Sequence, residues 1–278
     1  MNKTTLNIKI AYNEMGKAEK RIADWIESHP GEIISLSIVE LAEKCNCSEA
    51  TIVRFSKRLG FNGYQGLKIS LASESGNVTV NTSISNDDSA FEMYEKVCND
   101  IYCSLEMTKK SLSPESLSKA AEKLCSANKI VVFGLGNSAS VALDASHKFL
   151  RAGLNAVAYS DNHMQVIAAS HLHENDVAVA ISHSGSSKDI VDALKIAGEH
   201  GACTVAITDC GKSPIRKYCD IVLSTSADET RYNILALNSR IVQLAIIDAL
   251  YFYIVYNRSA EALESIQATE HALMSKKY

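Results

Sequence analysis

Two kinds of hydrophobic periodicity divide the chain. From about Asn13 to Leu71, apolar residues recur at helical spacing, as in Ile22 and Ile26, with almost no strand-like signal. From Ala90 onward, short apolar runs rich in β-branched residues alternate with helical stretches. The intervening stretch Ser73–Ser89 is dominated by Ser, Asn, Thr and Asp, which is typical of a linker. We therefore expect an all-helical region, a linker and an α/β region.

The apolar runs of the C-terminal region predict a parallel sheet. Alternation of strand and helix with short turns favours parallel pairing, here in a doubly wound α/β domain with five strands. The expected strands are Ile130–Phe133, Ala156–Tyr159, Val177–Ile181, Thr204–Ile207 and Ile221–Leu223. The expected helices include Ala139–Leu150, His163–Ser170, Lys188–Glu199 and a long apolar helix over Glu229–Tyr256.

The most apolar run, Leu244–Tyr256, raises the question of a membrane. It is too short to span a bilayer and carries Asp248, so it is interpreted as a buried helix and no membrane partner is expected. Such a helix covers its own sheet and also offers apolar surface for self-association.

Two short helices near the N-terminus predict a helix-turn-helix. Ser37 is a suitable N-cap for Ile38–Lys44, and Glu40 completes a capping box. After a tight turn, Ser48 is the N-cap of a second helix over Glu49–Leu59.

The second of these helices has a basic outer face. Thr51, Arg54, Lys57 and Arg58 are expected to project opposite its apolar side, and Glu49 is its only acid. Such a face suits the major groove of DNA, although charge alone leaves a solvated helix face as an equal alternative. The whole chain has a net charge of −4, so any DNA contact needs a local basic patch, repeated by oligomerisation.

The first candidate ligand loop follows the strand that ends at Phe133. Gly136, Asn137 and Ser138 stand where that strand passes into a helix, and a helix start favours anions. The loop lacks the third glycine of a dinucleotide site and the Gly-Lys-Ser/Thr of a nucleoside-triphosphate loop.

The second candidate loop, Ile181–Lys188, also joins a strand to a helix. Its hydroxyl groups and backbone N–H groups can satisfy the oxygens of a phosphate without a dedicated cation. An ordinary serine-rich N-cap turn is the alternative for this loop taken alone. Two such loops at carboxyl strand ends, where open α/β sheets bind ligands, favour a phosphate pocket.

The N-terminal motif resembles a known family. The runs Leu36–Ala42, Ser48–Phe55 and Leu59–Tyr64, with Leu67-Lys68, are similar to the DNA-binding module of MurR/RpiR-family bacterial regulators. With the basic face, this resemblance implies double-stranded operator DNA as a partner. The expected DNA contacts are Ser48, Thr51, Arg54, Lys57, Arg58 and Tyr64.

The two loops, together with Asp161–Gln165, resemble the sugar isomerase (SIS) domain. The resemblance implies that a phosphate is held by Asn137, Ser138, Ser182, His183, Ser184 and Ser187. Gly136, His163 and Glu229 complete the expected ligand-binding set.

An aldose–ketose isomerase with an accessory helical domain is the alternative function. Isomerases of this type carry a Glu-x-Lys-His-Gly-Pro segment that supplies the base, whereas this chain has only the glutamate in Glu229–Ile234. We therefore expect a sensor and not an enzyme, with no cofactor. Cys45 and Cys47 lack the partner pair of a zinc site, so no metal is expected either.

Together these features predict a cytoplasmic transcriptional repressor controlled by a phosphorylated sugar. The expected domains are a helix-turn-helix domain over 1–76, a linker over 77–100 and a SIS-like domain over 101–278. Resemblance to regulators of sialic-acid catabolism favours N-acetylmannosamine 6-phosphate as the effector. Family members are dimers or larger, so a homodimer or higher homo-oligomer is expected.

Overall fold

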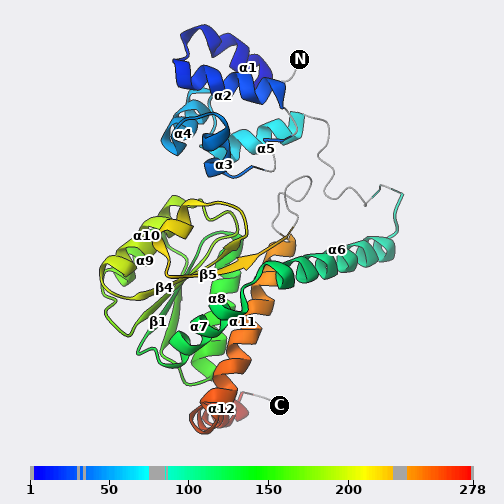
Figure 1. The fold of residues 1–278 in the computed structure, drawn as a ribbon. Helices are drawn as coiled ribbons and strands as arrows, with labels where there is room; N and C mark the ends of the chain where they lie inside the picture. Colours follow the sequence, from blue (N-terminus) through cyan, green and yellow to red (C-terminus); the bar gives the residue numbers. More distant parts are fainter. Residues whose placement is uncertain are drawn as a thin grey trace. The chain divides into compact units, whose positions relative to one another are not determined.

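The computed structural model describes residues 3–29, 32–33, 36–74, 85, 87–227 and 237–276. The chain divides into two compact units (Figure 1), one formed mainly by residues 1–99 and the other by most of 100–278.

The N-terminal unit is all-helical, as predicted. Its helices pack around one apolar cluster in which Ile22, Leu41, Ile52, Phe55 and Leu67 are fully buried. Because these residues recur at helical spacing on four helices, each helix buries a single face. The helices are α1 (Lys3–Ala11), α2 (Lys17–Ser28), α3 (Ile38–Lys44), α4 (Glu49–Arg58) and α5 (Tyr64–Glu74), with a short 3₁₀ turn at Tyr12–Glu14.

The C-terminal unit contains a five-stranded sheet in the order β2-β1-β3-β4-β5, with every pairing parallel. All five predicted strands are confirmed. β1 and β3 are buried along their whole length, which explains their continuous apolar sequences. The strands are β1 (Ile130–Gly134), β2 (Ala156–Tyr159), β3 (Val177–Ile181), β4 (Cys203–Asp209) and β5 (Ile221–Thr225).

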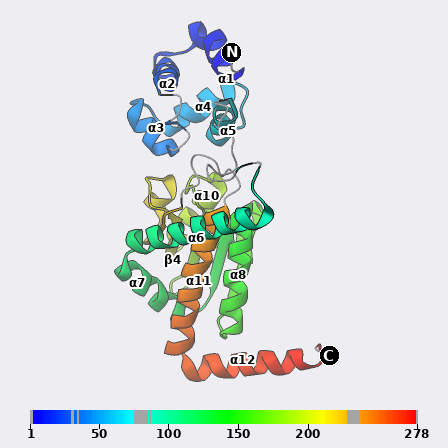
Figure 2. The ribbon, with the colours of Figure 1, turned by 90° about the vertical axis from the view of Figure 1, so that its right-hand side faces the viewer.

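Helices cover both faces of this sheet (Figures 1 and 2). One face packs against α7 (Pro114–Cys125), α8 (Asn137–Arg151) and α11 (Leu237–Asn257). The other face packs against α9 (Asn162–Ala169) and α10 (Lys188–Glu199). A 3₁₀ turn at Pro214–Tyr218 precedes β5.

Three helices of the C-terminal region were not predicted from the sequence: α7 and the two described next. α6 (Ala90–Ser111) joins the C-terminal unit through Thr108, whose hydroxyl donates to Ser226 O over 3.1 Å. α12 (Ser259–Met274) runs across the far ends of α8 and α11 (Figure 2), where Arg151 pairs with Glu270 at 2.7 Å.

The region expected to be a linker is partly helical. Residues 90–100 belong to α6, whereas 77–84 and 86 lie outside the described residues.

Helix α11 corrects the expectation that its apolar run is too short to span a membrane. By length and composition Asn238–Asn257 is sufficient. The helix nevertheless packs on the sheet through Ile246, Ile247 and Leu250, and Asp248 pairs with Lys148 of α8. These contacts are those of a core helix. Residues 229–236 of the expected helix lie outside the described residues.

Candidate functional site

Helices α3 and α4 form a helix-turn-helix whose two starts are capped as the sequence predicts. Ser37 N donates to Glu40 Oε2 over 2.8 Å, and Glu40 N donates to Ser37 Oγ over 3.2 Å. At the start of α4, Thr51 N donates to Ser48 Oγ. Asn46 takes a positive φ of 48° in the turn, a conformation that its short polar side chain tolerates.

The basic outer face of α4 is smaller than the sequence predicts. Arg54 and Lys57 are exposed. Arg58 is also exposed, but its guanidinium donates to Glu19 Oε2 over 2.7 Å and to Glu14 O over 3.1 Å. These bonds hold Arg58 toward α2, so Arg54 and Lys57 are the basic groups of α4 best placed to meet DNA.

Two further expected DNA contacts, Thr51 and Tyr64, are buried and each is 8% exposed. The Thr51 hydroxyl lies 2.8 Å from Ser48 Oγ within the helix cap, so the prediction that Thr51 projects outward is wrong. The Tyr64 hydroxyl donates to Leu36 O over 3.0 Å, and Lys68 Nζ donates to the same carbonyl over 2.9 Å. Tyr64 therefore supports the entry to α3 from inside the unit. Burial raises the pKa of Tyr64 and lowers the pKa of Lys68 to about 8.

Arg21 supports the helix-turn-helix, and sequence reasoning missed it. Its guanidinium donates to Cys45 O over 2.9 Å and to Asn46 O over 2.6 Å, so α2 fixes the turn between α3 and α4. The residue is exposed and carries an ordinary surface charge, so nothing in its local sequence marks this role.

The two serine-bearing loops lie side by side at the carboxyl edge of the sheet. β1 and β3 are neighbours, and their last residues, Gly134 and Ile181, stand opposite one another. Each loop leads directly into a helix, α8 or α10. The predicted position of both loops at carboxyl strand ends is confirmed, and their adjacency brings two helix starts to one place.

The first loop begins α8 with a glycine at the N-cap. Gly136 adopts φ 56° and ψ −127°, a conformation essentially restricted to glycine, and it has no side chain that could cap α8. Asn137 is the first residue of α8 and Ser138 the second. The positive end of the α8 dipole at this position favours an anion.

The second loop combines buried and exposed hydroxyl groups. Ser182 is 4% exposed, whereas Ser184 is exposed. Ser187 is the N-cap of α10, yet its hydroxyl makes no capping bond to the helix. The loop is fastened to β4, because the carbonyl oxygen of His183 accepts from Asp209 N over 2.9 Å.

The remaining expected ligand residues lie near the first loop or outside the described residues. His163 is exposed and is the second residue of α9. Gln165, two residues later, is fully buried, and its amide donates to Tyr159 O over 2.8 Å and to Gly134 O over 3.3 Å. Gln165 thus ties together the ends of β1 and β2, and the Asp161–Gln165 motif was the signal for it. Glu229 lies outside the described residues.

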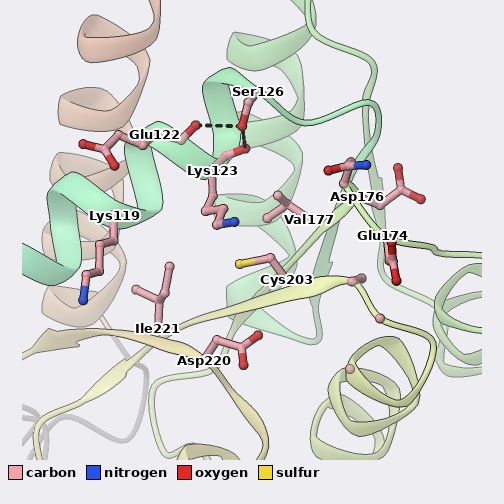
Figure 3. A pocket seen from close by; sticks show the side chains of 14 residues that line it. Lys119, Glu122, Lys123, Ser126, Glu174, Asp176, Val177, Cys203, Asp220 and Ile221 are labelled. Atoms are coloured by element: carbon pink, nitrogen blue, oxygen red, sulfur yellow. Dashed lines mark hydrogen bonds between the residues drawn. The ribbon is translucent and has the colours of Figure 1, made fainter.

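A cavity of about 820 Å³ lies at the opposite, amino-terminal edge of the sheet (Figure 3). It is bordered by the first residues of β3, β4 and β5. Its acids serve the fold, since Asp176 Oδ2 accepts from His173 N and Asp220 Oδ2 accepts from Thr204 N and Oγ1. Because both aspartates are bonded within the fold, we do not assign a ligand to this cavity. The carboxyl edge of the sheet remains the candidate site.

Known proteins resemble both parts of the chain. Residues 2–77 match the helix-turn-helix domain of the rpiR family, and residues 123–253 match the SIS domain. An HTH-type transcriptional regulator of Caldanaerobacter subterraneus is 37% identical over 262 residues, which cover 94% of this chain and 93% of the relative. The HTH-type transcriptional regulator HexR of Pseudomonas aeruginosa is 33% identical over 273 residues, with coverage of 98% and 95%. The Vibrio vulnificus NanR protein complexed with ManNAc-6P has the same fold, with a TM-score of 0.80, 22% identity and coverage of 99% and 100%.

Proposed function

Because the chain belongs to the rpiR family of helix-turn-helix transcriptional regulators with a SIS domain, we propose that it is a repressor whose operator binding is controlled by a sugar phosphate. The observation that carries the proposal is the pairing of two serine-bearing loops at adjacent strand ends, each leading into a helix whose N-cap residue makes no side-chain capping bond.

The phosphate of the effector binds between the starts of α8 and α10. Helix N-termini and hydroxyl donors stabilise a dianion without a buried cation, and charge-assisted hydrogen bonds are stronger than neutral ones. Gly136 allows the backbone to approach the ligand closely. The phosphate-binding side chains in this proposal are Asn137, Ser138, Ser182, His183, Ser184 and Ser187.

His163, which is exposed at the start of α9, is proposed as one hydrogen-bonding group for the effector. Glu229 is proposed as a second hydrogen-bonding group for the sugar. The likeness of fold to NanR complexed with ManNAc-6P supports N-acetylmannosamine 6-phosphate as the first effector to test. The chain acts as a sensor in this proposal, because its Glu229–Ile234 segment lacks the His-Gly-Pro of the isomerases it resembles.

DNA is bound by the exposed start and outer face of α4. Arg54 pairs with a base edge in the major groove, whereas Ser48 and Lys57 contact phosphates. The protein acts in the cytoplasm as a homodimer, so that two copies of this small basic face meet one operator. Exposed apolar side chains on the adjacent helices α8 and α11, Leu143, Leu150, Phe252 and Tyr256, support such an association.

A thermal stabilisation screen of sugar phosphates on the purified protein tests the proposal. A ligand at about 100 times its dissociation constant adds roughly 2.7 kcal/mol to the free energy of unfolding. We expect stabilisation by N-acetylmannosamine 6-phosphate or another sugar 6-phosphate, and none by the unphosphorylated sugar. Equal responses to the sugar with and without its phosphate would contradict the proposed pocket.

A further inference from the structure

Several buried polar atoms in the described part of the C-terminal unit lack hydrogen-bond partners, and two of the fully buried side chains that carry them lie on α11 and β5. Gln243 of α11 is 0% exposed, and neither its Nε2 nor its Oε1 has a hydrogen-bond partner among the residues that the structure describes. Thr225, the last residue of β5, is also 0% exposed, and its hydroxyl lacks a partner as well. Buried polar groups without partners destabilise a fold, so their presence calls for a functional explanation.

Both side chains face the layer between the sheet and α11. Side chains alternate along a strand, so Thr225 lies on the same side of β5 as Leu223. Leu223 is buried in the core cluster that the sheet shares with α11. On the helix, Gln243 precedes Ile246 and Ile247 by three and four residues and therefore shares their buried face.

This layer reaches the edge of the sheet that carries the phosphate loops. α8 and α11 run in parallel, since Lys148 Nζ lies 2.5 Å from Asp248 Oδ1 and the end of α8 meets α12, which follows α11. Lys148 and Asp248 each stand eleven residues after the first residue of their helix, so the two helices begin at the same level. Helical side chains tilt toward the helix N-terminus, which directs the Gln243 amide toward that edge.

Hydrogen bonds connect Thr225 to the second phosphate loop. Asp209 N, at the end of β4, donates to His183 O, and the next residue, Cys210, donates from its N to Thr225 O over 2.8 Å. Two strand spacings of about 4.8 Å place Thr225 roughly 10 Å from the loop. A six-carbon sugar with its phosphate in the loop can span this distance.

We propose that Gln243 and Thr225 recognise the sugar end of the effector and thereby determine which sugar phosphate the protein senses. The inference rests on the proposed function and deepens it. An amide offers a donor and an acceptor, and a hydroxyl offers both, which suits neighbouring hydroxyl or acetamido groups of a sugar. Both groups are covered, so the sugar reaches them only after the first turns of α11 move away from β5.

The test compares Gln243→Leu and Thr225→Val with the wild type. Each substitution nearly preserves shape and removes the unpartnered group, so the melting temperature of the protein without ligand should rise or stay unchanged. Affinity is then measured by calorimetry for N-acetylmannosamine 6-phosphate, glucose 6-phosphate and inorganic phosphate. Both variants should bind the sugar phosphate preferred by the wild type about tenfold more weakly or worse, and inorganic phosphate equally well.

Ile247→Val provides the matched control on the same buried face of α11. It should lower the melting temperature and leave the affinity for the sugar phosphate unchanged. Variants of Gln243 and Thr225 that bind the sugar phosphate like the wild type would overturn the inference while leaving the proposed function intact. A wild type that binds inorganic phosphate but none of the sugar phosphates in the thermal stabilisation screen would overturn both.

Discussion

Replacing Gly134 with alanine tests the geometry of the first serine-bearing loop, which leads from β1 into α8. Gly134 ends β1 directly beside the first turn of α8. A Cβ atom at this position would lie 2.5 Å from Ser138 O, 2.9 Å from Ser138 C and 3.0 Å from the Cβ of Ala142. Because the closest atoms belong to the backbone, no side-chain rotation relieves the contact, and the start of α8 must shift by at least about 0.5 Å.

The expected effects follow from this displacement. Overpacking of this kind lowers the free energy of unfolding by about 1–3 kcal/mol, or roughly 2–12 °C in melting temperature for a unit of this size. The same shift moves Ser138 and the neighbouring backbone amides, so affinity for the sugar phosphate should fall about tenfold or more. Differential scanning calorimetry and calorimetric titration measure the two effects.

Gly198→Ala is the matched control in the same unit. Gly198 lies in α10, where an added Cβ meets only Thr204 Cγ2 at an ordinary 3.5 Å. This variant should gain about 0.5–1 kcal/mol, because alanine loses less backbone entropy in a helix than glycine does. A Gly134→Ala variant with the melting temperature and the affinity of the wild type would show that the start of α8 is not displaced or does not hold the ligand.

Three further predictions concern other parts of the molecule. In gel-shift titrations, Arg54→Ala should cost about 1–3 kcal/mol of operator binding and relax sequence preference. Lys57→Ala should weaken binding to operator and random duplexes alike. If both variants lost the same affinity on both duplexes, Arg54 would not contact a base. Burial lowers the pKa of Lys68 to about 8, so between about pH 8 and 10.5 the unfolded chain binds more protons than the folded one and the free energy of unfolding rises with pH. Lys68→Met should abolish this rise in denaturant titrations, and an unchanged pH profile would contradict the assignment. A sensor should show no deuterium at C1 or C2 of a bound sugar phosphate by proton NMR in deuterated water, and incorporation at the usual enzymatic rate of ~1–10³ per second would favour an isomerase.

Local sequence signals predicted most of the fold. The capping box of Ser37 and Glu40 and the N-cap Ser48 fixed the starts of α3 and α4, because these caps are made by neighbouring residues. The five strands were predicted because buried parallel strands read as continuous apolar runs. α6 was missed, since its first turns follow a polar stretch and resemble a continuation of it.

The site was predicted less completely, because burial depends on contacts distant in sequence. Thr51 and Tyr64 were expected at the DNA surface, yet Thr51 serves the cap of α4 and Tyr64 bonds to Leu36 O. The amide of Gln243 gave no signal at all, since a glutamine in an apolar helix is ordinarily placed on its exposed side.

In a sensor of the proposed kind, a sugar phosphate and operator DNA control each other's binding through this one chain. Calorimetry with a duplex selected from random sequence as operator tests it most directly. The dissociation constant of the preferred sugar phosphate is measured on the free protein and on the protein saturated with operator. Because coupling between sites is reciprocal, we expect the sugar phosphate to bind about 5- to 150-fold more weakly in the presence of operator. Identical dissociation constants in the two titrations would contradict it.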